Sequence, residues 1–167
     1  MFLDESRCNT DMTRRYAYSL GGSRAVDSAP LSKPKNTTIL SSIQLDGTLR
    51  YTTFSSGTTV ERFKRYLKTD LLPHLNGNSV LIMDNMKSHR AKSVKNLLDN
   101  SGVRYIYLPP YSPNLNPIEK LWSKVKALLH KFKARTLDVL PDVIQRAFQN
   151  VSPSNYSGWF RFCNYLH

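Results

Sequence analysis

Residues 79–84 have the sequence SVLIMD, a continuous apolar run that stops abruptly at Asp84. Such a run is typical of a strand buried on both faces and places Asp84 at the C-terminal end of that strand. A helix is expected from about His89 to Asn100, and residues 104–108, RYIYL, are expected to form another strand. Strand, helix and strand in this order indicate a parallel crossover, and hence an α/β fold with a mixed central sheet flanked by helices.

The most regular helix is expected to begin downstream, at Asn116-Pro117, where Asn suits the cap position and Pro the first helical position. Glu119 lies in the first turn of this helix. On a helical wheel it falls beside the apolar stripe rather than opposite it, so it can face a cleft while the helix packs. The stripe is formed by Ile118, Leu121, Trp122, Val125, Leu128, Leu129 and Phe132.

The rest of the chain supplies a hairpin and further helices. Residues 37–45 and 49–54 are rich in β-branched and apolar side chains and flank Asp46-Gly47, a pattern that predicts a hairpin. Thr58 and Glu61 have the spacing of a capping box for a helix that Pro73 closes. Residues 28–35 are expected to form a polar loop, residues 137–150 a helix, and the segment after Pro153 a short helix.

The charge of the chain is lopsided, with 24 Lys and Arg against 12 Asp and Glu among 167 residues. A polyanionic partner is the natural inference, although some soluble proteins are simply basic. No apolar stretch is long enough to cross a membrane, which favours nucleic acid over membrane as the partner. The N-terminal residues do not resemble a signal peptide, and Cys8 and Cys163 form no disulfide framework, so we expect a cytoplasmic, nucleoid-associated protein.

Carboxylates are scarce in this chain, and three lie at ends of expected structural elements: Asp4 after an apolar triplet, Asp84 after the run at 79–83, and Glu119 in the first turn of a helix. In parallel sheets, ligands bind just beyond the strand ends. Each residue also has an ordinary structural explanation. Asp4 could be solvated at a frayed start, Asp84 could belong to a turn, and Glu119 could be half of a capping box.

Three carboxylates together suit phosphodiester chemistry. Cleavage near neutral pH requires an activated water and stabilised charge on the attacking and leaving oxygens, which two Mg²⁺ ions supply. Such ions prefer hard oxygen ligands. Lys126 and Lys133 follow Glu119 at steps of seven residues and share its flank, while Lys120, Lys124 and Lys131 lie on another flank. Both rows could contact phosphates, or they could be the solvated side of an amphipathic helix.

Three segments of this chain resemble a known family: FLDES at 2–6, LIMDNMKSH at 81–89, and YLPPYSPNLNPIEKLWSKVK at 107–126. They resemble the catalytic domain of transposases of the mariner-like superfamily, especially its bacterial insertion-sequence branch, which carry an Asp-Asp-Glu triad on a ribonuclease H-like fold. Thirty-four residues, 85 through 118, separate Asp84 from Glu119, which is the interval this branch uses. The resemblance covers nearly the whole chain.

The resemblance implies that Asp4, Asp84 and Glu119 bind Mg²⁺ or Mn²⁺, with two ions expected. It implies hydrolysis at transposon ends that gives a 3′ hydroxyl, attack of that hydroxyl on target DNA, and a homodimer that joins paired ends. His89, at the expected start of a helix, could orient a ligand or contact phosphate, or it could be a structural residue, as histidines at helix starts commonly are. The loop that presents the glutamate is matched by Tyr111, Ser112, Pro113, Asn116 and Pro117. The expected DNA-binding residues are Asn85, Lys87, His89, Arg90, Lys120, Lys124, Lys126 and Lys133.

The chain also departs from the family. Family members usually have more residues before the first aspartate than the three found here, and they carry helix-turn-helix modules upstream. We therefore expect one catalytic domain, residues 1–167, without the DNA-recognition module. Two alternatives remain open: a catalytically inactive DNA-binding remnant, and another metal-dependent nuclease of the ribonuclease H-like type.

Overall fold

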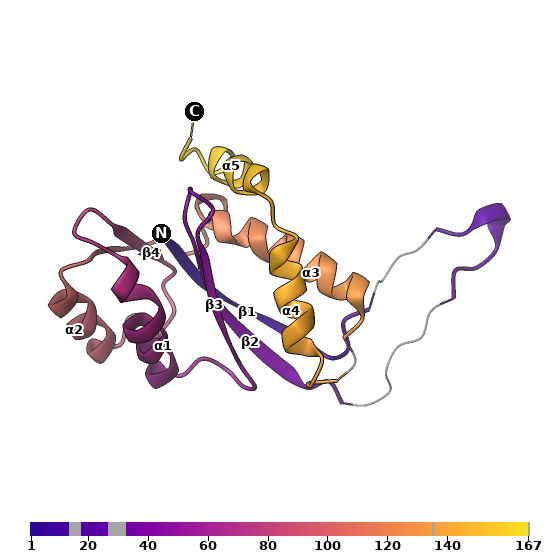
Figure 1. Ribbon diagram of the computed structural model, residues 1–167, viewed down its shortest axis with the longest axis horizontal. Coiled ribbons are helices and arrows are strands. Elements are labelled where there is room, and N and C mark those ends of the chain that lie inside the picture. Colours follow the sequence, from indigo (N-terminus) through magenta and orange to yellow (C-terminus); the bar gives the residue numbers. More distant parts are fainter. Residues whose placement is uncertain (14–17, 27–32, 135, 167) are drawn as a thin grey trace.

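A mixed five-stranded sheet forms the centre of the computed structural model, which describes residues 1–13, 18–26, 33–134 and 136–166 (Figure 1). The expected loop at 28–35 lies mostly outside these residues. The strands are β1 (Phe2–Asn9), β2 (Asn36–Ile43), β3 (Leu49–Phe54), β4 (Val80–Met83) and β5 (Arg104–Tyr107). They lie in the order β3-β2-β1-β4-β5, with β1, β2 and β3 antiparallel and with β4 and β5 parallel to β1. This topology confirms the predicted α/β class and the ribonuclease H-like arrangement.

Helices cover both faces of the sheet (Figure 1). The long helix α3 (Pro117–Phe132) packs on one face with α4 (Leu140–Gln149) and α5 (Pro153–Phe162). The other face is covered by α1 (Val60–Tyr66) and α2 (Lys92–Ser101). The shorter helical segments are η1 (Leu20–Gly22), η2 (Leu67–Leu71), η3 (Leu72–His74) and η4 (Pro113–Leu115).

Two apolar clusters follow from the alternation of side chains along the strands, because successive side chains of a strand point to opposite faces. Phe2 packs under α3 with Ile118 and Trp122, whereas its neighbour Leu3 joins Phe63 and the cluster under α1 and α2. Asp4 has the same parity as Phe2 and therefore faces α3. The sheet thus sends the first aspartate into the layer that also contains Glu119.

The register of the central strands brings two carboxylates together. In the parallel pair of β1 and β4, Leu3 lies opposite Met83, and the next residues along the two strands are Asp4 and Asp84. Neighbouring strands are about 4.8 Å apart. Asp4 does not end its strand, as its place after an apolar triplet had suggested, because β1 continues to Asn9 in antiparallel pairing with β2. It lies where the parallel pairing ends.

The predicted hairpin is confirmed, with Gly47 in the turn at a positive φ of 87°. Helix boundaries differ by a few residues from the predictions. The cap of α1 is Thr59 rather than Thr58, since the Thr59 side chain accepts a hydrogen bond from the Arg62 amide. Helix α4 begins at Leu140 rather than at residue 137, because Pro141 lacks an amide hydrogen and fits only the first turn.

Helix α2 begins at Lys92, and His89 precedes it. The backbone at residues 86–90 forms a turn in which the amides of His89 and Arg90 both donate to the Met86 carbonyl. The predicted end of this helix is confirmed, with Gly102 in the left-handed conformation at φ 70°. His89 is therefore part of this turn, and its ring packs into the core on Phe63.

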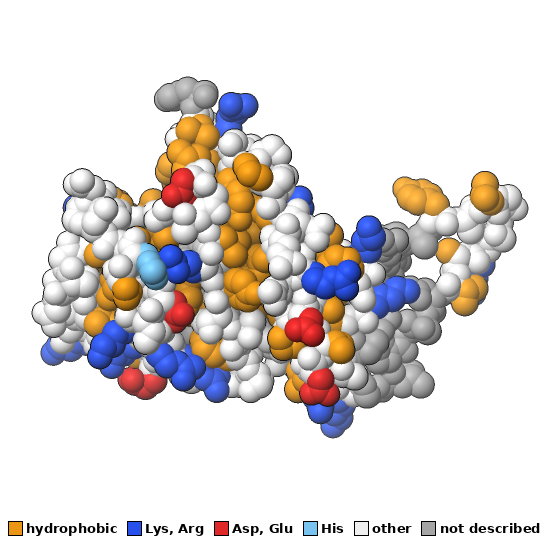
Figure 2. Space-filling view, viewed as in Figure 1, with side chains coloured by type: hydrophobic (Ala, Val, Ile, Leu, Met, Phe, Trp, Pro, Cys, Tyr) orange, Lys and Arg blue, Asp and Glu red, His pale blue; other side chains and the backbone are white. Residues whose placement is uncertain are grey.

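Residues 18–26, in the excursion between β1 and β2, lie away from the body of the molecule (Figure 1) and carry the exposed apolar side chains Tyr18, Leu20 and Val26. Lys and Arg side chains are spread over the face seen in Figure 2, in keeping with the basic composition. Among the described helices, none is both long and apolar enough to cross a membrane.

Candidate active site

Asp4 is the buried member of the candidate site, with 5% of its surface exposed. One carboxylate oxygen, Oδ1, accepts a hydrogen bond from the Glu5 amide at 2.7 Å. The other, Oδ2, accepts from Trp122 Nε1 at 3.3 Å and from Asn116 Nδ2 at 3.4 Å. Both oxygens are therefore oriented by the strand itself and by α3. The frayed, solvated start that was an alternative for Asp4 does not occur.

Asp84 lies directly after β4 and is partly exposed. Its Oδ1 accepts a hydrogen bond from the Met86 amide at 3.1 Å, which is the turn expected after such a strand. The same oxygen lies 2.6 Å from Nδ1 of His89. The His89 ring is fully buried and stacked on Phe63, with ring centroids 4.2 Å apart. In this position His89 lies against the Asp84 carboxylate and has no surface with which to contact a DNA phosphate.

Glu119 lies in the first turn of α3 and is exposed. It lines a hollow of about 490 Å³ together with Asp84, so the second and third carboxylates share one open space. The remaining lining residues are Asn85, Met86, Leu108, Pro109, Pro110, Tyr111, Ser112, Pro113 and Asn116. For the described helix α3, Asn116 makes no side-chain capping bond, so the capping-box explanation of Glu119 is not supported. The Asn116 side chain is used on Asp4 instead.

Asp84 and Glu119 act electrostatically on Asp4. The pKa of Asp4 is raised from its ordinary value to about 7, mainly by burial and in smaller part by the negative charges of Asp84 and Glu119. The hydrogen bonds from the Glu5 amide and Trp122 oppose this rise. The charges of Asp84 and Glu119 act on Asp4 because the fold brings these groups, which are far apart in sequence, near one another.

The donor chemistry of this cluster fits a divalent cation, because three carboxylates offer hard oxygen ligands and concentrated negative charge. Among the described residues, however, no three His, Cys, Asp or Glu side chains already lie close enough to hold one ion. The orientation of two carboxylates explains why the ligand chemistry is suitable although no ion-sized cluster is formed. Asp84 is turned toward His89 and the Met86 amide, and Glu119 extends into the hollow.

The predicted DNA-binding residues fall into separate groups. Lys87 and Arg90 are exposed and follow Asp84 closely in the sequence, but the Asn85 amide donates to the Leu108 carbonyl at 2.7 Å and ties two loops together. Lys126 lines a polar hollow of about 340 Å³ beside the end of β1, and Lys133 follows α3 in the left-handed conformation. The structure therefore brings Asn85 to the hollow that Asp84 and Glu119 line, leaves Lys87 exposed, sets Arg90 over the Tyr107 ring, and places Lys126 farther along α3.

Two predicted DNA-binding lysines lie under α5 instead. Lys120 Nζ lies 3.7 Å from the centroid of the Phe162 ring, and Lys124 Nζ donates to Oδ1 of Asn155. Both lysines pack against α5, so this flank of α3 is covered by a neighbouring helix.

Sequence reasoning missed the parts that Asn116 and Trp122 play at the site. Asn116 was assigned to the helix cap and Trp122 to the apolar stripe, and both assignments are correct for the backbone and for packing. Each side chain also carries an N–H group that a core position must satisfy. Because Trp122 lies 118 residues from Asp4, no sequence pattern could have paired them, and the pairing depends on the fold.

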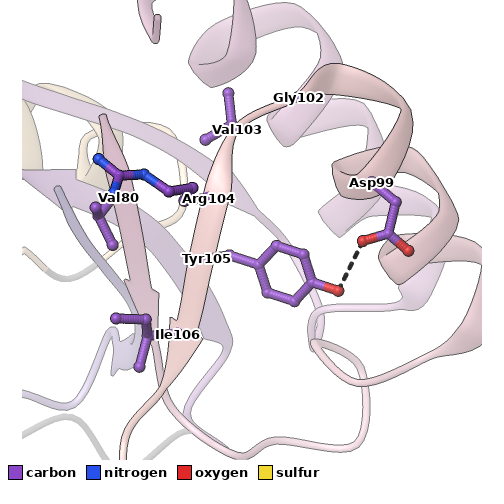
Figure 3. Close-up of a pocket in the computed structure, with 7 residues that line it drawn as sticks. All are labelled: Val80, Asp99, Gly102, Val103, Arg104, Tyr105 and Ile106. Atoms are coloured by element: carbon purple, nitrogen blue, oxygen red, sulfur yellow. Dashed lines mark hydrogen bonds between the residues drawn. The ribbon is translucent and has the colours of Figure 1, made fainter. Parts of the chain in front are cut away.

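A larger hollow, about 580 Å³, lies at the outer edge of β5 (Figure 3). It contains one acidic residue, Asp99, whose carboxylate accepts a hydrogen bond from the Tyr105 hydroxyl at 2.9 Å. Val80, Arg104 and Ile106 form much of its wall. This hollow offers no cluster of carboxylates among its lining residues, so we assign the chemistry to the smaller hollow beside Asp84 and Glu119.

Comparison with solved structures supports the fold assignment. The chain is similar to the Mos1 transposase paired-end complex with left transposon end, with a TM-score of 0.79 and 18% identity over 96% of this chain and 50% of that chain. It is also similar to the Mos1 paired end complexes with Mn (TM-score 0.77, 17% identity, 98% and 52% of the two chains) and with Mg (0.71, 17%, 96% and 50%). The chain spans about half the length of these Mos1 chains. No curated protein sequence matches it.

A family model covers most of the chain, including the segments at 2–6, 81–89 and 107–126. The model for the DDE superfamily endonuclease matches residues 1–140, which include Asp4, Asp84 and Glu119. The topology, the convergence of the three carboxylates and the likeness to transposase catalytic domains agree with this match. The chain belongs to the DDE superfamily endonuclease family.

Proposed function

We propose that this domain cleaves DNA strands in the transposition of an insertion element of the bacterial insertion-sequence branch, and that it joins the released end to target DNA. The observation that carries the proposal is the register of β1 and β4, which sets Asp4 beside Asp84 on the sheet face that α3 covers with Glu119. Transposase catalytic domains among the structural neighbours support it.

In this proposal Asp4, Asp84 and Glu119 hold Mg²⁺ or Mn²⁺, two ions being expected. Such ions supply Lewis-acid activation and stabilise charge on the attacking and leaving oxygens of an in-line displacement. The site's own residues divide the work. Asn116 and Trp122 fix the Asp4 carboxylate, His89 orients that of Asp84, and Glu119 is exposed and can turn toward them.

The two reactions differ in the nucleophile. In cleavage, water attacks phosphorus, the phosphodiester bond breaks, and one strand ends in a 3′ hydroxyl. In joining, that hydroxyl attacks a phosphorus of target DNA and displaces a target 3′ oxygen. Lys87 and Arg90 are exposed and follow Asp84 closely in the sequence, and we expect them to bind phosphates. A homodimer that holds two ends, acting on DNA in the nucleoid, completes the proposal.

The test is cleavage of labelled duplex and pre-nicked DNA in the presence of Mn²⁺, with the wild-type protein and Asp84→Asn. The variant is expected to lose metal-dependent cleavage while keeping its fold, because only the charge of a ligand changes. Asp138→Asn, at an exposed aspartate near the start of α4, is the matched control and should cleave normally. Equal cleavage by wild type and Asp84→Asn would refute the assignment.

A second candidate, a DNA-binding domain without catalysis, is favoured by one observation: the described carboxylates are not already arranged around an ion. Thermal unfolding with and without millimolar Mn²⁺ separates the two, since an ion that binds the native state stabilises it. Stabilisation that Asp84→Asn abolishes supports the nuclease. No stabilisation together with no cleavage would support the inactive domain.

A further inference from the structure

The loop between β5 and α3 forms an apolar wall beside the candidate catalytic carboxylates. Pro109, Pro110, Tyr111 and Pro113 line the same hollow of about 490 Å³ as Asp84 and Glu119. This volume lies within the roughly 300–1,000 Å³ typical of small-ligand sites. A space with carboxylates on one side and flat apolar groups on another suits a nucleotide better than a phosphate alone.

The loop is held rigidly at both ends. Asn85 donates to the Leu108 carbonyl at 2.7 Å where the loop begins, and the Tyr165 hydroxyl donates to the Leu115 carbonyl at 3.0 Å where it ends. The loop's three prolines restrict the backbone further, since each fixes its own φ. Tyr111 is therefore presented by a stiff support rather than by a flexible tip.

Tyr111 has an unfavourable backbone conformation that is not compensated by packing of its side chain. Its side chain is fully exposed, at 102% of the reference value, so it contributes nothing to the core. Its backbone has a φ of 56°, the left-handed region that favours glycine and disfavours a bulky residue. Backbone conformations of this kind are concentrated at functional sites, where the surrounding structure holds them in place.

The chemistry of an exposed tyrosine ring beside a DNA-cleaving site points to a base. Aromatic rings stack on the faces of nucleobases, and this contact tolerates any sequence. Inside a duplex both faces of a base are covered by its neighbours, so only an unpaired base offers a face to the ring. We propose that Tyr111 stacks on an unpaired nucleobase next to the scissile phosphate. The inference rests on the proposed function.

The test measures binding rather than cleavage, in buffer with a chelator, so that its result is independent of catalysis. Two labelled DNAs are compared, a fully paired duplex and the same duplex with one unpaired 2-aminopurine. The wild-type protein is expected to bind the second more tightly and to quench its fluorescence. Tyr111→Ala should lose about tenfold of this preference, since stacking on one base contributes about five- to 150-fold. Tyr111→Phe, which keeps the ring, should retain it.

Two further variants separate stacking from other effects. Tyr111→Gly accepts the positive φ and should keep or raise the melting temperature while it loses the preference. Tyr18→Ala removes an equally exposed tyrosine from the excursion between β1 and β2 and should keep the preference. The proposal is overturned if the wild type shows no preference, if Tyr111→Ala retains it, or if Tyr111→Phe loses it. Loss of cleavage in Asp84→Asn would stand in each case.

Discussion

The candidate site has a buried half and an open half that are held in different ways. In the buried half, Asp4 lies inside the sheet and receives hydrogen bonds from Trp122 and Asn116 of the α3 segment. In the open half, Asp84 and Glu119 line a hollow and are reached by solvent. The first carboxylate is thus fixed by buried hydrogen bonds, whereas Asp84 is held on one oxygen by the Met86 amide and Glu119 is exposed.

This difference fits a site that must gather metal ions and DNA. A rigid buried carboxylate gives a fixed reference point, whereas exposed carboxylates can move onto an ion without disturbing the core. It also predicts that the two halves respond differently to substitution. Changes in the buried half alter the stability of the whole domain, and changes in the open half alter metal binding and cleavage alone.

The largest effect on stability is expected from Trp122→Ala. Trp122 is buried in the cluster under α3 and lies edge-on to Phe148, so its removal should cost about 3–5 kcal/mol of unfolding free energy. Urea denaturation measures this. Trp122→Phe retains most of the packing and should lose less, and Glu119→Gln should stay within about 0.5 kcal/mol of wild type. A Glu119→Gln variant as unstable as Trp122→Ala would remove the distinction between the halves.

A smaller effect, dependent on pH, is expected from Asp4→Asn. Burial and the neighbouring charges raise the pKa of Asp4 to about 7, so the folded protein binds a proton that the unfolded chain releases near pH 4. Wild-type stability should therefore fall as pH rises from about 4 to 7 and then level off. Asp4→Asn lacks this slope. In chelator at pH 8 it should be more stable than wild type, because the variant has no buried carboxylate to ionise.

Urea denaturation at pH 5, 6 and 8 checks the slope. Glu119→Gln serves as the comparison in the open half and should keep most of the slope, because burial is the main cause of the raised pKa of Asp4 and only one neighbouring negative charge is removed. Parallel curves for wild type and Asp4→Asn across this range would show that Asp4 is ionised as readily as in the unfolded chain.

The sequence predicted the parts of the site that depend on local pattern. The strand at 80–83, the helix after Pro117 and the position of Glu119 beside the apolar stripe all follow from periodicity and capping, and the structure confirms them. The structure also confirms the parallel crossover, because a strand, a helix and a strand leave few alternatives. The sheet order and the partner of each buried N–H group depend on contacts distant in sequence, which periodicity does not encode.

His89 shows why the remaining residues were harder to assign. Its sequence position, five residues after Asp84, fits an orienting role, a phosphate contact or a structural role. The phosphate contact is excluded because the turn at 86–90 buries the ring on Phe63 of α1, a residue 26 positions earlier. The same holds for Lys120 and Lys124, whose neighbours on α5 lie more than 30 residues downstream. Side-chain burial by distant elements was beyond the reach of a single-sequence pattern.

The smallest predicted effect concerns DNA binding by two lysines of α3, one beside an open hollow and one covered by α5. Lys126 lies on the open flank, whereas Lys124 is engaged by Asn155. Lys126→Ala should weaken DNA binding by about 1 kcal/mol or less, equally for all sequences, and should reduce the salt dependence by about one phosphate contact. Lys124→Ala should leave that slope unchanged. Fluorescence anisotropy over a series of salt concentrations measures both, and equal slopes for the two variants would show that α5 does not shield its flank from DNA.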